Sequence, residues 1–324
     1  MTDDDFKKKI ILPNHWGFCL PERRIVQVRG TDMWGFLQGL VTNDIKNLSL
    51  ESIIYTAILT PQGKYLLDFF IINVSRDALD IDIESSCVDD LVAKLEMYSL
   101  SREISFEVLP QTVFQLYPHP SFSAEPKPID NTQINEICAE EGARVFVDPR
   151  NSCLGVRVYY PCPITTRDTA NAIQLQNDGK NINVDEGSFT LLRIRHLIPE
   201  RHTELVPEQS YILEYGFEKI HGVSFRKGCY VGQEIIARMH HKATLHKGLY
   251  CVKASVPLPE TGQEIMCGEK VAGRLCSVFG HEGIAHLNST RIADAQPLVA
   301  DNIELDLNSI RTTFPCIVHN IQQD

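Results

Sequence analysis

One ordered succession of strand and helix patterns, between residues 24 and 109, restricts the fold of this chain more than any other feature. Apolar runs typical of strands occupy residues 24–29, 53–59, 65–74, 79–83 and 104–109. Residues 31–41 have the apolar spacing of a helix, and a second helix is expected to start near Ser86, a residue type that caps helices. The predicted order is β-α-β-β-β-α-β, an embellished ferredoxin-like α+β pattern.

The rest of the chain is predicted to add a second α+β unit and a small β-barrel. Prolines near residues 118–128 indicate an exposed connection. Downstream we expect a short helix, strands at 144–147 and 154–160, a further helix, and a helix at 185–197. Short β-rich runs after residue 246 are typical of a barrel. Because 324 residues are long for one core, we predict three domains: residues 1–110, 111–245 and 246–324.

Charge and composition exclude several classes of protein. The net charge of −11 argues against direct binding of nucleic acid, which needs a basic face. No apolar run approaches the 18 residues of a membrane span. Residues 1–5 are acidic, unlike a signal or transit peptide, so we expect a bacterial cytoplasmic protein, with a mitochondrial matrix protein less favoured. Ten scattered cysteines without a CxxC pair indicate a reducing compartment and mostly buried thiols.

The octapeptide from Lys227 to Glu234 concentrates the most chemistry. Cys229 lies between glycines, directly after two cationic residues, and the sequence then enters a predicted helix. Cationic neighbours and a helix N-terminus both favour a thiolate, the nucleophilic and metal-binding form. Gly228 and Gly232 allow a positive φ and the close approach of a ligand. The alternative, a buried and inert cysteine, remains open.

This octapeptide, Lys-Gly-Cys-Tyr-x-Gly-Gln-Glu, resembles the signature of the YgfZ family of folate-binding proteins. These proteins are relatives of the glycine-cleavage aminomethyltransferase (T-protein), and they include a mitochondrial factor that helps mature [4Fe–4S] proteins. Further similar blocks occur at residues 30–32, 36–39, 42–44, 61–64, 193–199 and 207–208. The resemblance, which covers about residues 25 to 250, implies an aminomethyltransferase-type folate-binding region followed by a C-terminal β-barrel.

The resemblance also implies a set of functional residues. Cys229 is the expected catalytic residue, and tetrahydrofolate or a related reduced folate is the expected ligand. Residues expected to contact the ligand are Asn43, Asp44, Phe189, Arg193, Glu208, Lys227, Gly228, Tyr230, Gly232, Gln233, Glu234 and Arg238. Simpler interpretations remain open: a helix stop at residues 42–44, a core phenylalanine at 189, a surface glutamate at 208, and a helix start at 233–234.

Two departures from the family pattern bear on activity. Leu67 occupies the position at which aminomethyltransferases carry an aspartate that assists one-carbon transfer, and leucine cannot accept a proton. Asp68 follows, but strand alternation points it to the opposite face. Arg23 stands where relatives carry a tryptophan on the first strand. Whether the chain is an enzyme therefore stays open.

Three histidines follow the octapeptide, at positions 240, 241 and 246, and suggest a metal site with Cys229. Neighbouring helical residues point about 100° apart, and no spacing matches a zinc ribbon or a ferredoxin cluster. We therefore expect no permanent metal. We expect a folate-binding protein that assists maturation or repair of iron–sulfur enzymes, with A-type carrier or scaffold proteins as partners and an indirect effect on tRNA modification. The alternatives are a tetrahydrofolate-dependent aminomethyltransferase and a non-catalytic scaffold.

Overall fold

The chain folds into two compact units, each built from several stretches of sequence. The computed structural model describes residues 15–99, 102–118, 143–161, 176–177, 180–181, 186–242, 245–293 and 296–312. Unit 1 comprises Met1–Leu59, Leu67–Phe189 and Ile220–Val231, and unit 2 comprises Thr60–Leu66, Thr190–Lys219 and Gly232–Asp324. The predicted domain boundaries at 110 and 245 stay predictions. The proline-rich connection and the predicted helices near it lie outside the described residues.

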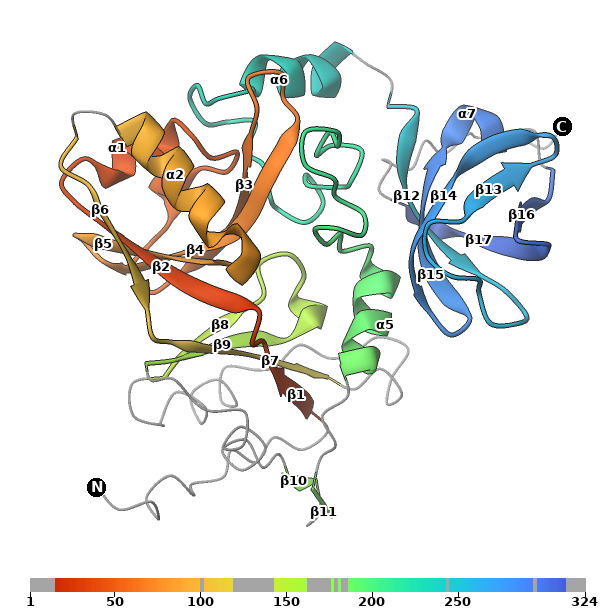
Figure 1. Ribbon diagram of the computed structural model, residues 1–324, viewed down its shortest axis with the longest axis horizontal. Coiled ribbons are helices and arrows are strands. Elements are labelled where there is room, and N and C mark those ends of the chain that lie inside the picture. Colours follow the sequence, from red (N-terminus) through yellow and green to blue (C-terminus); the bar gives the residue numbers. More distant parts are fainter. Residues whose placement is uncertain are drawn as a thin grey trace, which may run out of the picture. The chain divides into compact units, whose positions relative to one another are not determined.

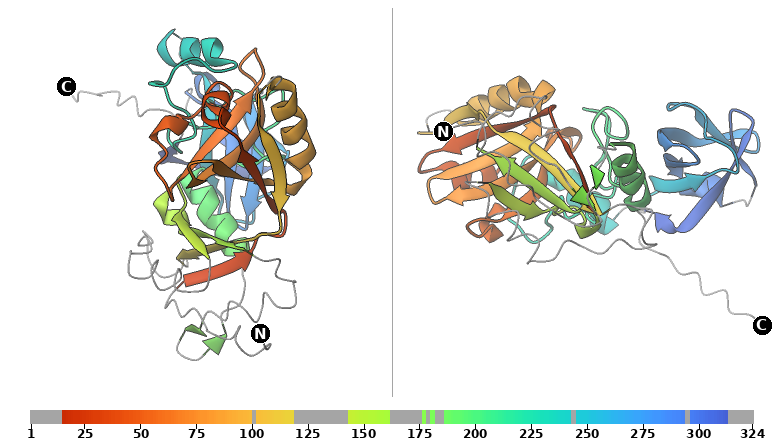
Figure 2. Two further views of the ribbon diagram at one scale, coloured as in Figure 1. Left: turned by 90° about the vertical axis from the view of Figure 1, so that its left-hand side faces the viewer. Right: turned by 90° about the horizontal axis from the view of Figure 1, so that it is seen from below.

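Unit 1 contains an antiparallel sheet in the order β3-β4-β5-β2-β6 (Figure 1). Its strands are β2 Arg23–Arg29, β3 Ile53–Leu59, β4 Tyr65–Ser75, β5 Ala78–Glu84 and β6 Ser105–Leu109. Helix α1 (Met33–Gln38) and helix α2 (Val88–Ser99) occur at the predicted places in the order. Helix α2 lies along one face of the sheet (Figure 2) and buries Leu91 and Leu95. The α+β pattern predicted for residues 24–109 is confirmed.

A second sheet covers the other face, in the order β1-β7-β9-β8. Its strands are β1 His15–Cys19, β7 Thr112–Pro118, β8 Arg144–Val147 and β9 Val156–Tyr160; β10 Gln176–Asn177 and β11 Lys180–Asn181 form a separate pair. Apolar side chains of the two sheets form one core: Ile25, Ile72, Val113, Phe146 and Tyr159. Sequence patterning did not predict β1 and β7, which pair with each other although about ninety residues separate them.

Charged side chains also lie buried between these sheets, and we call Arg23, Asp80, Asp82, Arg144 and Arg157 the inter-sheet charge layer. Asp80 and Asp82 are fully buried on β5. Arg157 Nη2 lies 2.6 Å from Asp82 Oδ2, and Arg23 Nε lies 2.6 Å from Asp82 Oδ1. Arg144 Nη2 lies 2.6 Å from Asp80 Oδ2. The alternating aspartates of β5 therefore face a second sheet, and each is ion-paired as buried carboxylates need to be.

The ionisation of Asp82 follows from these partners. Burial alone raises the pKa of this carboxyl group, but the Arg157 and Arg23 guanidinium groups outweigh burial and lower its pKa from 3.8 to about 2. The Tyr159 hydroxyl donates a further hydrogen bond to Asp82 Oδ2, at 2.8 Å. Arg157 also lies 4.3 Å from the centre of the Phe70 ring.

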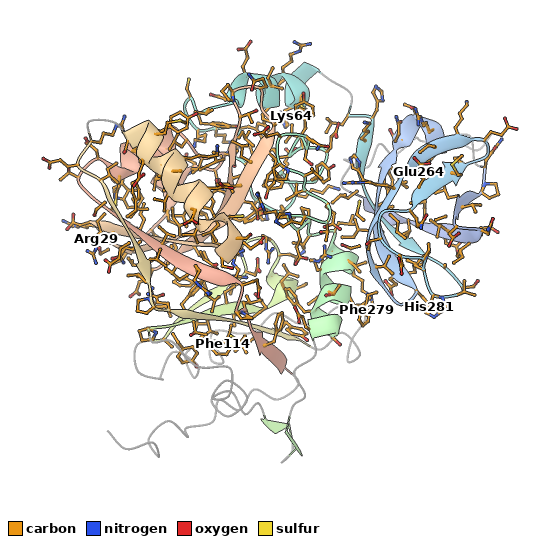
Figure 3. All side chains as sticks on the ribbon, viewed as in Figure 1. Arg29, Lys64, Phe114, Glu264, Phe279 and His281 are labelled. Atoms are coloured by element: carbon orange, nitrogen blue, oxygen red, sulfur yellow. The ribbon has the colours of Figure 1, made fainter. Side chains whose placement is uncertain are left out.

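Unit 2 ends in a closed barrel in the strand order β12-β15-β14-β13-β16-β17. The strands are β12 Lys247–Lys253, β13 Glu264–Cys267, β14 Lys270–Phe279, β15 Glu282–Asn288, β16 Leu298–Ala300 and β17 Ile303–Thr312. Its interior is apolar, with Val252, Ile265, Leu275 and Leu287 fully buried. Phe279 and His281 mark the turn between β14 and β15 (Figure 3). The predicted C-terminal barrel is confirmed, although the three residues of β16 were too short to predict.

Three helices and three short 3-10 turns complete the elements with assigned bounds. The helices are α5 Glu186–His196, α6 Gln233–Lys242 and α7 Ser289–Ile292. The 3-10 turns are η2 Ile45–Asn47, η3 Ser85–Cys87 and η4 Ser152–Leu154, and the segment from 197 to 232 is otherwise built of turns. This turn-rich segment carries most of the octapeptide.

Candidate functional site

Two motifs that are about 180 residues apart in the sequence are joined by hydrogen bonds in unit 1. They are the loop at residues 39–44, after α1, and residues 221–231, which we call the Cys229 segment. Thr42 Oγ1 donates to Gly222 O at 2.7 Å, and Asn43 Nδ2 donates to His221 O at 2.7 Å. Backbone bonds from Ser224 N to Thr42 O and from Val231 N to Gly39 O add to the junction. The fold therefore brings together two motifs that the sequence marked separately.

Lys227 fastens this junction with its ammonium group. Lys227 Nζ donates to Val41 O at 2.5 Å and to Asn43 O at 2.8 Å, and the residue is only 7% exposed. Burial lowers the pKa of the Lys227 ammonium to about 8, against the opposing effect of the Asp44 carboxylate. The ammonium group also lies 4.9 Å from the centre of the Tyr230 ring. Lys227 is thus a buried clamp on backbone carbonyls and not a solvated loop charge.

Cys229 is exposed on this clamped segment. Among the cysteines in the described part of the chain, Cys229 alone is exposed; Cys19 and Cys153 are partly buried, and Cys87, Cys251, Cys267 and Cys276 are buried. A Cβ atom added at the neighbouring Gly228 would meet no heavy atom within 4 Å. The first helical residue of α6 is Gln233, four residues after Cys229. The buried, inert alternative for Cys229 therefore does not hold, while its catalytic role stays a prediction.

The side chains of Asn43 and Asp44 form hydrogen bonds to other groups of the protein. Asn43 Nδ2 donates to Tyr55 O at 2.8 Å in addition to its bond to His221. Asp44 Oδ1 accepts from Gln38 Nε2 at 2.8 Å and from Lys46 N at 3.1 Å, so it caps the short η2 turn. Both residues shape the loop, and contact with a ligand stays a prediction.

The hairpin block around Gly63 lies against α6 in unit 2. Gly63 has φ +74°, and a Cβ atom there would come within 2.9 Å of Ile235 Cβ, so only glycine fits without strain. Gly232, at φ +82°, makes the turn into α6. Tyr65 N donates to Ser210 O at 2.9 Å, and Glu208 N donates to Tyr65 O at 2.7 Å. The hairpin thus connects the Pro207–Glu208 block with the start of α6.

Leu67 is buried, with 2% exposure, and offers no proton acceptor. The next residue, Asp68, accepts a hydrogen bond from the Tyr55 hydroxyl at 2.8 Å. The alternation predicted for the two residues agrees with these environments.

Two of the predicted folate contacts are occupied by packing within the protein. Phe189 lies 5.3 Å from both Phe18 and Tyr117, ring centre to ring centre, and is buried. Arg193 is buried too, with Nη1 3.1 Å from Glu204 Oε2 and Nη2 2.6 Å from Ser277 Oγ. Ser277 Oγ donates in turn to Glu204 Oε1 at 2.5 Å. These contacts favour a core phenylalanine at 189 and a link from Arg193 to barrel strand β14.

Glu208 fits a ligand-binding role better than Phe189 or Arg193 does. Its side chain is exposed, and its backbone has φ +61°, a conformation that non-glycine residues rarely adopt. Strained residues gather at functional sites. Phe189 belongs to unit 1 and Glu208 to unit 2. The contact of Glu208 with a reduced folate stays a prediction, as do the other expected contacts.

The last predicted residues lie on or near α6. Gln233 is partly buried, and Glu234 and Arg238 are exposed. Tyr230 is buried, and burial raises the pKa of its phenol. His240 Nε2 lies 3.2 Å from Glu218 Oε1, and the Nδ1 atoms of His240 and His241 approach to 3.4 Å, nearer than helical geometry led us to expect. Within the described ranges, no group of three or more His, Cys, Asp or Glu side chains is arranged to hold a metal ion.

The backbone acceptors that build the junction carried no sequence signal. Val41 and Asn43 accept from Lys227 with backbone oxygens, and Gly222 does the same for Thr42. A backbone carbonyl is present at every position, so no residue pattern predicts which one an ammonium group will bind.

The fold belongs to the aminomethyltransferase class. The structure aligns with a glycine cleavage system aminomethyltransferase T from Bartonella henselae with a TM-score of 0.71, covering 92% of this chain and 86% of that one at 12% identity. Residues 246–311 match the profile described as CAF17, C-terminal beta-barrel domain.

The sequence comparisons identify the homologues more closely. The chain is 28% identical to the mouse iron-sulfur cluster assembly factor IBA57, mitochondrial, over 92% of this chain and 84% of that protein. It is 32% identical to the Mycosarcoma maydis IBA57 homolog over 70% of this chain and 54% of that protein. The homologues of this chain are thus the IBA57 proteins, relatives of the YgfZ family, and the resemblance found in the sequence is confirmed.

The expected bacterial cytoplasmic location is wrong. The mouse, Mycosarcoma maydis and Dictyostelium discoideum relatives are all named as mitochondrial proteins. The expectation depended on the acidic charge of residues 1–5, and the charge of so short a stretch does not determine a compartment. As for membranes, none of the helices in the described ranges combines the length and the apolar character needed to cross one.

Proposed function

We propose that this protein is an iron–sulfur cluster assembly factor of the mitochondrial matrix that acts through Cys229. The names of the homologues support the assembly role and the compartment. The observation that carries the proposal is the exposed Cys229 thiol on a segment fastened by the Lys227 ammonium group. A thiolate is a nucleophile and a good ligand for iron, so the segment presents a reactive group to a partner.

We further propose that the protein binds a reduced folate such as tetrahydrofolate, with Glu208 as an acceptor for pterin nitrogens. The aminomethyltransferase fold supports this. The affinity should be modest, with a Kd in the tens of micromolar, or about −6 kcal/mol. Arg23 stands in place of an aromatic residue, and its guanidinium is bound to Asp82. Calorimetry with tetrahydrofolate tests the proposal, and the absence of heat and of competition at millimolar ligand would reject it.

Aminomethyl transfer is the less favoured function. Leu67 is buried within β4 and cannot accept a proton. Asp68 is engaged by the Tyr55 hydroxyl. Turnover of an aminomethyl donor with tetrahydrofolate would make aminomethyl transfer the favoured function.

A non-catalytic scaffold for A-type cluster carriers is the second candidate. It is favoured by the internal contacts of Asn43, Phe189 and Arg193, because side chains used for packing do not take part in chemistry. Under either candidate the partners are cluster carrier proteins, and an effect on tRNA modification is indirect, through iron–sulfur enzymes that thiolate tRNA. The chain's net charge of −11 agrees with an indirect effect.

One experiment separates the two candidates. Cells that lack their own homologue receive the wild-type chain or the Cys229→Ala variant, and the activity of a [4Fe–4S] enzyme is measured. The proposal expects no rescue by Cys229→Ala, with normal protein levels. Full rescue, with partner binding retained, would establish the scaffold.

A further inference from the structure

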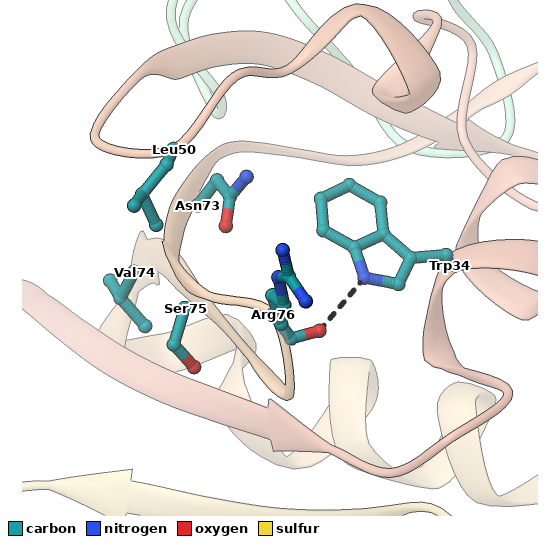
Figure 4. A pocket seen from close by; sticks show the side chains of 6 residues that line it. All are labelled: Trp34, Leu50, Asn73, Val74, Ser75 and Arg76. Atoms are coloured by element: carbon teal, nitrogen blue, oxygen red, sulfur yellow. Dashed lines mark hydrogen bonds between the residues drawn. The ribbon is translucent and has the colours of Figure 1, made fainter.

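A pair of histidines on α6 specifies the chemistry of a ligand, which the hollow of unit 1 does not. Trp34 and Arg76 are among the residues that line this hollow (Figure 4). Its Asn73 Oδ1 atom has no hydrogen-bond partner in the described part of the chain, but burial closes this atom off from any occupant. The histidines are His240 and His241, in the last turn of α6 in unit 2.

The rings of the two histidines meet through one nitrogen each. His240 Nδ1 lies 3.4 Å from His241 Nδ1, the ring centres are 4.6 Å apart, and the ring planes are inclined by 85°. Successive residues of a helix point about 100° apart, so the two side chains turn back toward each other. Both residues are exposed. The two nitrogens therefore converge at the surface of the protein, where an ion from solvent can reach them.

The separation of these two nitrogens is that of two ligands on one metal ion. Zinc binds an imidazole nitrogen at about 2.0–2.1 Å, and the tetrahedral angle then places two such nitrogens about 3.4 Å apart. Imidazole suits divalent transition metals such as Zn²⁺, Ni²⁺ and Cu²⁺, whereas Mg²⁺ and Ca²⁺ prefer oxygen ligands. The observed 3.4 Å between the Nδ1 atoms thus lets both rings bind one ion without a large change of position.

Glu218 orients one of the two rings. Its Oε1 atom accepts from His240 Nε2 at 3.2 Å, and Glu218 belongs to the turn-rich segment of the same unit. A neutral imidazole that donates from Nε2 carries its lone pair on Nδ1, the atom that faces His241. A carboxylate on the far nitrogen is the usual outer partner of a metal-binding histidine, because it fixes the tautomer and raises the basicity of the ligand. Glu218 is therefore placed as a positioning residue for metal binding.

We propose that His240 and His241 bind one exchangeable divalent transition-metal ion through their Nδ1 atoms. Water fills the other positions, because the described ranges contain no group of three or more His, Cys, Asp or Glu side chains arranged to hold an ion. His241 binds with its proton on Nε2, so the proton between the two Nδ1 atoms moves to Nε2 through solvent and none is lost overall. Two protein ligands make a weak site, which differs from a permanent metal centre.

The test is a titration of the full chain, labelled with ¹⁵N at histidine, with Zn²⁺. The Cys229→Ser chain is used, so that the exposed thiol takes no metal. The chain has 11 histidines, and His240→Gln and His241→Gln assign the two signals. The Nδ1 signals of both residues should shift together and saturably, with a Kd of about 10–100 μM. Either single variant should weaken binding at least about tenfold, because one imidazole then remains.

Two further measurements separate a metal site from a hydrogen-bonded pair of rings. Glu218→Gln should weaken Zn²⁺ binding about tenfold, because glutamine lacks the charge that raises the basicity of His240. His246→Gln, at an exposed histidine of the same unit, is the matched control and should leave the Kd unchanged. Mg²⁺ should shift neither Nδ1 signal. No shift of these signals up to about 1 mM Zn²⁺, or unchanged affinity in His240→Gln, would overturn the proposal.

Discussion

Unit 1 buries charge in two regions and uses it differently in each. In the inter-sheet charge layer, carboxylates and guanidinium groups pair with each other, as Asp82 does with Arg23 and Arg157. In the Cys229 segment, the Lys227 ammonium group has no carboxylate at hydrogen-bond distance in the described part of the chain and donates to backbone carbonyls. Paired charges hold two sheets together, whereas a cation on carbonyls fixes the course of one loop.

The difference predicts where mutation will affect stability and where it will affect function. Breaking a buried ion pair leaves its partner charge uncompensated in the core. Removing the clamp leaves two uncharged backbone carbonyls without that donor. Removing the exposed thiol leaves no buried group unpaired. The predictions below run from the largest expected effect on stability to the smallest.

Asp82→Asn should destabilise the protein by about 3–5 kcal/mol, because Arg157 and Arg23 then lose their buried counter-charge. Urea unfolding followed by circular dichroism measures this. Asp77→Asn, an exposed aspartate in the turn before β5, is the matched control and should change the free energy of unfolding by less than about 0.5 kcal/mol. An equal loss of unfolding free energy in both variants would show that the inter-sheet charge layer does not stabilise the protein.

The ion pairs of Asp82 with Arg23 and Arg157 also predict how the stability of unit 1 changes at acid pH. The pKa of Asp82 is lowered from 3.8 to about 2 in the folded protein. A lowered pKa means that the stabilisation is present above the unfolded value and is lost as pH falls from about 4 to about 2. A shift of this size corresponds to roughly 2–3 kcal/mol. Urea unfolding at a series of pH values should show this loss in the wild type, and Asp82→Asn should flatten the dependence in that window.

Lys227→Met should destabilise the protein by about 1–3 kcal/mol and disorder the Cys229 segment. Methionine keeps much of the length of the side chain but cannot donate to Val41 O and Asn43 O. Limited proteolysis should then cleave near residues 221–231 faster than in the wild type. Arg226→Met is the control, because Arg226 is exposed next to the clamp. Equal proteolysis of both variants would mean that the clamp does not order the segment.

Sequence patterning predicted what depends on regular alternation and spacing. The strands and helices of residues 23–109 and most barrel strands were found because apolar periodicity records which face is buried. Strands β1 and β7 escaped because their pairing is between distant segments. The alternation of β5 could not show that Asp80 and Asp82 are buried, since only the second sheet makes their face an interior one.

The site was predicted in part, for a related reason. The octapeptide and the 42–44 loop were recognised as motifs and expected at one ligand, yet nothing in their residues indicated that they bond directly to each other. Lys227 was expected to favour the thiolate of Cys229. Its hydrogen-bond partners are instead backbone oxygens, which every residue has and which the sequence therefore cannot indicate. Arg193 was predicted to contact the ligand. Its contacts with Glu204 and Ser277 could be seen only in the folded structure, where β14 lies beside it.

Cys229→Ser should have the smallest effect on stability, below about 1 kcal/mol, because the side chain is exposed and the change in volume is small. Its effect on function should be the largest, because a serine hydroxyl is not ionised at neutral pH and is a poor ligand for soft metals. Limiting iodoacetamide followed by peptide mapping should label Cys229 before the buried Cys276, whose pKa burial raises to about 11. Cys251→Ser, at a buried position of β12, is the opposite control and should cost stability while sparing function. Full rescue of cells by Cys229→Ser, or earlier labelling of another cysteine, would make the thiol structural and leave the clamped segment as a docking loop.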